Sequence, residues 1–235
     1  MTITTEMTTS LYEYLLKLNQ EVAKELIETY DMQKDKKKGI RQGSKETLLV
    51  FPYKRNEQIR VSEQELRFAM TNLHGKCNSL NLTYAVEAPT KEEYAFSGKS
   101  KRSGSTDLAF YVGTNKVLNI ELKAHNPAQA VIDKDIEKLI NEDTPGAWCH
   151  IFESEDRGTL KSVFNKLGIA IDAHKCDKKR DKLLYFSFLI LSSRTLVTRI
   201  ADSRLNSIFS LEYEDYYNLP KGKHIVDKGW QVDKF

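Results

Sequence analysis

Two acidic residues and a lysine are spaced so that they could act together on a phosphate ester. Asp107 opens the segment 106–125, and Glu121 and Lys123 stand near its end, two residues apart. Neighbouring carboxylates repel each other, and a proton or a cation relieves the repulsion. Carboxylates that leave room for water suit Mg²⁺, with Mn²⁺ as a substitute, and such an ion lowers the pKa of a bound water while the lysine stabilises negative charge. The pattern therefore predicts metal-dependent hydrolysis of a phosphodiester.

The segment is expected to form two short strands joined by a tight turn. Side chains alternate between the faces of a strand, and directly opposed residues of an antiparallel pair point the same way. A three-residue connection, Gly113 to Asn115, sets Asp107 against Glu121. The same register sets Leu108 against Ile120, whereas a connection longer by one residue would put the acid on the apolar side. The expected register brings both carboxylates and the lysine to one face.

Asp107 followed by Glu121-Leu122-Lys123 on a strand hairpin resembles the PD-(D/E)XK nuclease superfamily. Thr106 stands where the family pattern has proline, which leaves the acid in place. The resemblance implies an α/β fold of the restriction-endonuclease-like class, with a three-layer core in which helices flank a central mixed β-sheet. It also implies a DNA endonuclease that uses Mg²⁺. The metal ligands would be Asp107, Glu121 and the Leu122 carbonyl, and Lys123 would act on the attacking water.

Two polar residues outside the hairpin are further candidates. The run Glu63-Gln64-Glu65-Leu66 is similar to the Glu-x-Glu-Leu run of archaeal Holliday-junction resolvases, which would make Glu63 an added metal ligand or water-positioning group. An ordinary carboxylate on a helix face is the alternative. Glu65 already has a structural role, because Ser62 and Glu65 match a capping box. Gln129, in the first turn of the helix after the hairpin, is the second candidate, since polar residues at this position place the attacking water in some relatives.

The net charge of the chain is only +3, but its basic residues are clustered. One cluster lies just upstream of the first acid, where a backbone phosphate would pass. The candidate DNA contacts are Lys99, Lys101, Arg102, Ser105 and His125. Each basic cluster is also typical of a solvated loop, and a surface ion-pair ladder remains the alternative to a catalytic site.

The chain has 235 residues, 40% of them hydrophobic and 29% charged, which suits one globular domain with a core. Residues 1–45 are expected to form an N-terminal helix and a basic linker, and residues 46–235 the nuclease domain. Three widely spaced cysteines favour reduced thiols and a cytoplasmic protein. The longest apolar run, 183–191, is too short to cross a membrane as a helix. The resemblance also makes a homodimer one possible arrangement.

Hydrophobic periodicity places the elements that must position these residues. Helices are expected over 10–30, 62–74, 126–141, 159–173 and 201–211, and strands over 47–53, 80–88, 148–153 and 183–191. Residues 94–105 are expected to form a loop. In the helix 126–141, Asn126 is the expected N-cap, and Lys134, Asp135 and Lys138 are expected on the exposed side.

Two other functions stay open at this stage. The chain could be a catalytically idle nuclease-like module that binds DNA or another protein, or it could cleave RNA by the same metal chemistry. A zinc site at Cys149-His150 and His174-x-Cys176 is disfavoured, because adjacent strand residues face opposite ways and the spacing does not match a finger. Restriction, mobile-element or phage DNA processing and repair are all compatible with the pattern.

Overall fold

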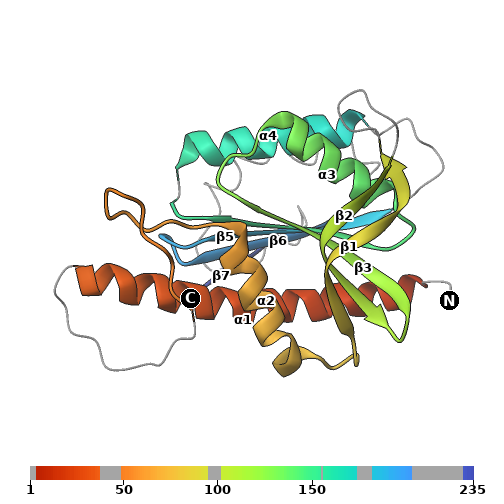
Figure 1. Ribbon diagram of the computed structural model, residues 1–235, viewed down its shortest axis with the longest axis horizontal. Helices are drawn as coiled ribbons and strands as arrows, with labels where there is room; N and C mark the ends of the chain where they lie inside the picture. The colour runs from red at the N-terminus through yellow and green to blue at the C-terminus, as the bar shows by residue number, and fades with distance from the viewer. Residues whose placement is uncertain (1–3, 38–48, 95–101, 155, 174–181, 203–229) are drawn as a thin grey trace.

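The computed structural model describes residues 4–37, 49–94, 102–154, 156–173, 182–202 and 230–235. Within these ranges the protein is α/β, with a seven-stranded mixed sheet and four helices (Figure 1). The helices are α1 (Thr5–Lys37), α2 (Glu63–Cys77), α3 (Gln129–Asn141) and α4 (Arg157–Ala173). The strands are β1 (Thr83–Tyr94), β2 (Arg102–Val112), β3 (Asn115–Ala124), β4 (Gly146–Phe152), β5 (Leu183–Ile190), β6 (Thr195–Asp202) and β7 (Trp230–Lys234).

The strands follow one another across the sheet in chain order. β3, β4 and β5 are parallel, and the other neighbouring pairs are antiparallel. Parallel neighbours need a crossover, which α3 and α4 provide between successive strands. Because both crossovers advance in the same direction and crossovers are almost always right-handed, the two helices are expected on one face. Figure 1 shows α3 and α4 on that face, and α1 and α2 on the other.

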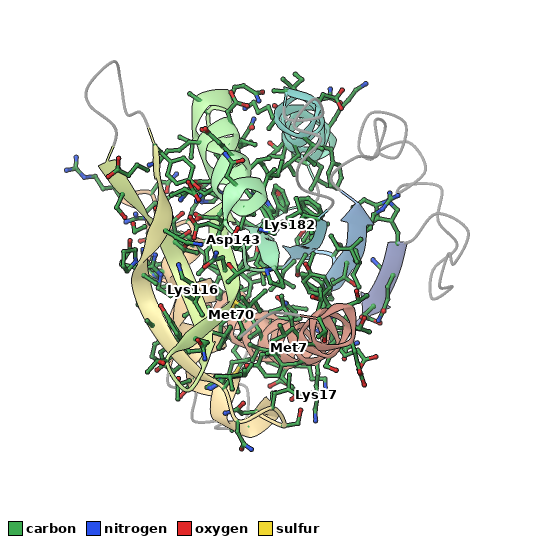
Figure 2. The ribbon with its side chains drawn as sticks, turned by 90° about the vertical axis from the view of Figure 1, so that its right-hand side faces the viewer. Met7, Lys17, Met70, Lys116, Asp143 and Lys182 are labelled. Atoms are coloured by element: carbon green, nitrogen blue, oxygen red, sulfur yellow. The ribbon has the colours of Figure 1, made fainter. Side chains whose placement is uncertain are left out.

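Each face of the sheet has its own apolar core, and Figure 2 shows side chains filling the space on both sides. On one side α1 and α2 pack against residues such as Leu108, Ile120 and Leu122. On the other, α3 and α4 pack against Trp148 and Phe188. Burial on both faces explains why β5 is almost continuously apolar, as expected for this strand. The segment 1–45 thus contributes α1 to a core that it shares with the sheet.

The hairpin of β2 and β3 has the expected register at the site, but its turn differs. Leu108 lies opposite Ile120, as predicted. The pairing of Val112 with Asn115 leaves a two-residue connection, in which Gly113 has a φ of 58°. The three-residue connection is therefore wrong. The register shifts by one residue between Phe110 and Tyr111, because β3 has one extra residue there, which forms a bulge. The bulge restores the predicted pairing of Leu108 with Ile120.

Three expected elements are wrong where the structure describes them. The two ends of the expected loop 94–105 are strand, because β1 runs to Tyr94 and β2 begins at Arg102, and 95–101 lie outside the described residues. The expected strand 47–53 is reduced, over its described residues, to one bridge between Tyr53 and Ile59. Ala201 lies in β6 rather than in a helix, and 203–211 lie outside the described residues. Pairing of Ala201 with Leu184 of β5 explains this difference, because pairing in a sheet overrides a weak local preference for helix.

The helix after the hairpin begins later than its sequence suggests. Its N-cap is Ala128, which makes no capping side-chain bond, so the expected cap at Asn126 is wrong. Asn126 instead accepts a hydrogen bond from Lys166 at 2.7 Å. At the other end of α3, Lys182, labelled in Figure 2, donates to the carbonyl of Leu139 at 2.5 Å. A cation at this end of a helix complements its dipole.

None of the helices in the described ranges combines the length and the apolar character that crossing a membrane would require.

His150 on β4 gives the fold a pH dependence. Burial lowers its pKa from 6.5 to about 3, so the folded protein holds the neutral ring. The unfolded chain binds a proton below pH 6.5, and stability is lost as the pH falls from there toward 3. We expect the free energy of unfolding to drop by about 2 kcal/mol between pH 6.5 and pH 5 through this group.

Urea unfolding at pH 7 and pH 5 measures this loss, with His150→Phe as the comparison. The ring of His150 stacks on Phe152 at 4.1 Å between centroids, so phenylalanine preserves the packing while removing the titrating group. The pH-dependent loss should be smaller in the variant by that amount. Equal losses in the two proteins would contradict the assignment to His150.

Candidate active site

Asp107, Glu121 and Lys123 lie together at one face of the hairpin. The Lys123 Nζ is 3.4 Å from Asp107 Oδ2 and 3.8 Å from Glu121 Oε2. The side chain of Glu121 is 1% exposed and that of Asp107 is 16% exposed. The arrangement predicted from strand alternation is therefore present, with one carboxylate buried and the other reachable from solvent.

Backbone geometry at Leu122 fixes the position of the first acid. The N–H of Leu122 donates to Asp107 Oδ2 at 2.7 Å. The carbonyl of Leu122 accepts from Lys123 Nζ at 2.9 Å. Both peptide groups thus pair with side chains of the site, beyond the last paired residues of β2 and β3, Leu108 and Ile120. The carbonyl expected as a metal ligand lies beside the carboxylates.

Two residues of α3 complete the cluster, and their expected exposure is wrong. Asp135 and Lys138 are each 4% exposed. Asp135 Oδ2 lies 2.8 Å from Lys123 Nζ, and its Oδ1 lies 2.8 Å from Lys138 Nζ. Lys138 also contacts Glu121 Oε1 at 2.7 Å and donates to the Ser105 carbonyl at 2.8 Å. They are buried because α3 turns this face toward the charged face of β3, where each charge finds a partner.

The electrostatics of the cluster keep the two ammonium groups protonated. Burial lowers the pKa of Lys123, but Asp135, followed by Asp107 and Glu121, more than offsets it and raises the pKa above its ordinary value. The pKa of Lys138 is also raised, because its carboxylate neighbours outweigh burial. Burial and then repulsion from Asp135 raise the pKa of Glu121 well above its usual range. The cluster is thus a largely buried network in which three carboxylates share two ammonium groups.

The start of α2 brings one more acid to this cluster. Ser62 caps the helix, and its N–H and Oγ donate to Glu65 at 2.7 and 2.6 Å, which confirms the capping box. Glu65 is thereby committed to the cap. Burial raises the pKa of Glu63, while Lys123 lowers it and Asp107 raises it, so Glu63 lies within electrostatic reach of the site. Of the two acids in this run, Glu65 is thus engaged in the helix cap, and Glu63 stays a prediction for the site.

Arg67 and Glu87 also belong to the site, and sequence reasoning did not assign them to it. Arg67 lies 3.1 Å from Asp107 Oδ1 and 2.9 Å from Glu87 Oε1. Glu87 occupies the β1 position opposite Asp107, with a φ of 52°. Arg67 stands one helical turn after Glu63, which was the available signal. Glu87 required the pairing of β1 with β2 to be known.

Two other candidates, Gln129 and His125, make contacts outside the triad. Gln129 donates to Asp133 Oδ1 at 2.6 Å and to the Lys166 carbonyl at 3.1 Å, on the side of α4. His125, with a φ of 58°, donates from Nε2 to the Val61 carbonyl at 2.5 Å. His125 also lines a pocket of about 170 Å³, whose lining does not include the side chains of the triad.

Of the expected DNA contacts, Ser105 donates from Oγ to Glu87 at 3.0 Å. Arg102 begins β2, where its backbone pairs with Tyr94. Lys99 and Lys101 lie outside the described residues.

Within the part of the chain that the structure describes, no three His, Cys, Asp or Glu side chains converge closely enough to hold a metal ion by themselves. The acids alternate with cations instead. Asp107 contacts Arg67 and Lys123, and Glu121 contacts Lys138. A metal ion at these carboxylates would have to replace part of these ion pairs.

Comparison with known proteins finds no matching family model, no matching curated protein and no matching solved structure.

Proposed function

We propose that the protein is a metal-dependent DNA endonuclease that hydrolyses phosphodiester bonds. The observation that carries this proposal is the convergence of Asp107, Glu121 and Lys123 beside the Leu122 carbonyl. A buried carboxylate and a partly exposed one that share a protonated lysine have little value for stability, because desolvating charges costs about as much as their attraction returns. Such a cluster favours a catalytic role.

The arrangement of the fold supports the restriction-endonuclease-like class. An antiparallel hairpin carries the acids, a helix follows it, and the next strand, β4, is parallel to β3. Helices cover both faces of the mixed sheet (Figure 1). We propose that these layers form the three-layer core of that class.

The donor atoms of the site fit Mg²⁺. Asp107, Glu121 and the Leu122 carbonyl offer hard oxygens, and Mg²⁺ is usually held by one or two carboxylates while it keeps several waters. When bound, the ion would activate a water and neutralise charge on the phosphate. Glu121 and Asp107 would hold it.

The residues of the chain would then share the remaining tasks. Lys123 carries a proton that three carboxylates help to retain, so it would donate a hydrogen bond that orients the attacking water or stabilises charge on a phosphate oxygen. Glu63, at the start of α2, would help to orient that water. Arg67 would add positive charge on the side of Asp107.

A second candidate function is a catalytically idle nuclease-like module that binds DNA or a protein. It is favoured by one observation: in the described structure, Asp107, Glu121 and Asp135 all have cationic side-chain partners. For such a module, affinity for DNA should not change with Mg²⁺ or with Glu121→Gln.

The purified protein should be incubated with supercoiled, linear and branched DNA, and with RNA of the same sequence, in Mg²⁺, in Mn²⁺ and in EDTA. Strand breaks in at least one DNA form with a divalent ion, and none in EDTA, are expected. Absence of cleavage in every DNA form, with DNA binding that is independent of Mg²⁺, would favour the idle module. Cleavage confined to RNA would change the substrate class while keeping the metal chemistry.

A further inference from the structure

Asp135 is the shared partner of the two buried ammonium groups. One oxygen lies 2.8 Å from Lys123 Nζ, and the other lies 2.8 Å from Lys138 Nζ. Its side chain is 6% exposed, so water does not screen these contacts. Neither the residue pattern nor the resemblance assigns it a role.

Distances within the cluster show which carboxylate holds the lysine. Lys123 Nζ is 2.8 Å from Asp135 but 3.4 Å from Asp107 and 3.8 Å from Glu121. Coulomb attraction between an ammonium group and a carboxylate grows as the distance shortens, and burial strengthens it. Asp135 therefore draws the ammonium group away from the two acids that would hold the metal ion.

We propose that Asp135 is a positioning residue that keeps Lys123 from occupying the metal-binding oxygens of Asp107 and Glu121. This inference rests on the proposed function. Without the α3 carboxylate, the ammonium group would move toward the remaining acids and compete with the divalent ion. Lys123, which already contacts Asp107 Oδ2 at 3.4 Å, would then pair more closely with the carboxylates that would hold the metal ion, and both metal binding and the reaction would weaken.

The other oxygen of Asp135 pairs with Lys138 at the same distance, 2.8 Å. Lys138 is anchored by Asp135, by the Ser105 carbonyl and by Glu121 Oε1. These three contacts leave it little freedom to approach Asp107. Lys123 is thus the ammonium group that Asp135 must restrain.

The test measures Mn²⁺ binding by the electron paramagnetic resonance signal of the free ion, together with steady-state DNA cleavage. For Asp135→Asn, we expect the Mn²⁺ dissociation constant to rise about tenfold and kcat to fall about tenfold, while KM for DNA changes less than about twofold. Adding Lys123→Met to this variant should return the Mn²⁺ dissociation constant to the wild-type value or below, because the competing ammonium group is gone.

Asp133→Asn is the matched control, because Asp133 lies on the same helix and bonds to Gln129 rather than to the site. It should bind Mn²⁺ like the wild type. Unchanged binding by Asp135→Asn, or weakened binding that Lys123→Met does not restore, would overturn the role of Asp135 and leave the nuclease function standing. A wild-type protein that neither binds Mn²⁺ nor cleaves DNA would remove both.

Folding of the variants is checked by circular dichroism. If Asp135→Asn does not fold, the same titrations use Asp135→Ser, whose shorter side chain leaves room for water beside the two ammonium groups. The expected rise in the dissociation constant and its reversal by Lys123→Met are the same. Failure of both variants to fold would identify Asp135 as a core residue and would overturn the proposal.

Discussion

Lys123→Met is expected to slow DNA cleavage about a thousandfold, the usual effect of removing a proton donor or charge stabiliser at a reacting phosphate. Methionine has a similar length and is compatible with the buried position of this side chain, which is 10% exposed. The loss should fall on kcat. Mn²⁺ binding should persist, because Asp107 and Glu121 keep their carboxylates. Single-turnover cleavage of the best DNA form measures the effect.

The control is Lys134→Met, which removes an exposed lysine of α3 that is the sequence neighbour of the buried Asp135. It should cleave DNA at the wild-type rate. Thermal unfolding of both variants shows whether the fold is intact. A folded Lys123→Met protein that cleaves within about tenfold of the wild type would exclude this lysine from catalysis and would contradict its proposed role in stabilising charge at the phosphate.

Lys138→Met is expected to have the largest effect on stability. The Lys138 side chain is 5% exposed, and its removal leaves Glu121 and Asp135 buried without one of their cations. Breaking a buried pair from one side costs about 3–5 kcal/mol, because the remaining charges stay out of water. Urea unfolding at pH 7 should therefore show a lower midpoint with an unchanged slope.

Two further variants separate this effect from general damage to the core. Adding Glu121→Gln to Lys138→Met removes one stranded charge and should recover part of the lost stability. Lys91→Met breaks an exposed pair with Asp143, in which both side chains are more than half exposed, and should leave stability unchanged within error. Equal stability of Lys138→Met and the wild type would mean that the buried network does not hold the fold together.

Strand alternation was sufficient to predict the register of the hairpin. The expected pairing of Leu108 with Ile120 is confirmed, and so is the gathering of Asp107, Glu121 and Lys123. This worked because one face of each strand is apolar, and a slip by one residue would bury the acid among aliphatic side chains. The predicted length of the turn was wrong, because a two-residue connection followed by a bulge gives the same alignment as a three-residue connection.

The exposure of α3 could not be predicted, because charged residues on a helix normally face water. Asp135 and Lys138 are buried only because the strand face beneath them is also charged, which is a tertiary property. The full length of β1 was missed for a similar reason. The carboxylate of Glu142 accepts from the N–H groups of Lys91 and Glu92, at 3.0 Å each, and it comes from about fifty residues further along the chain.

The position of α1 has a consequence for the order in which the polypeptide acquires its structure. This helix precedes the sheet in the chain, yet Tyr12 donates to the carbonyl of Leu183 at 2.6 Å, and the apolar side of α1 lies on strands that include β5 and β6. Its hydrophobic surface is therefore covered only after these two strands have been synthesised. A prematurely terminated product would carry a long helix with an exposed hydrophobic side, so we expect it to bind chaperones or to aggregate.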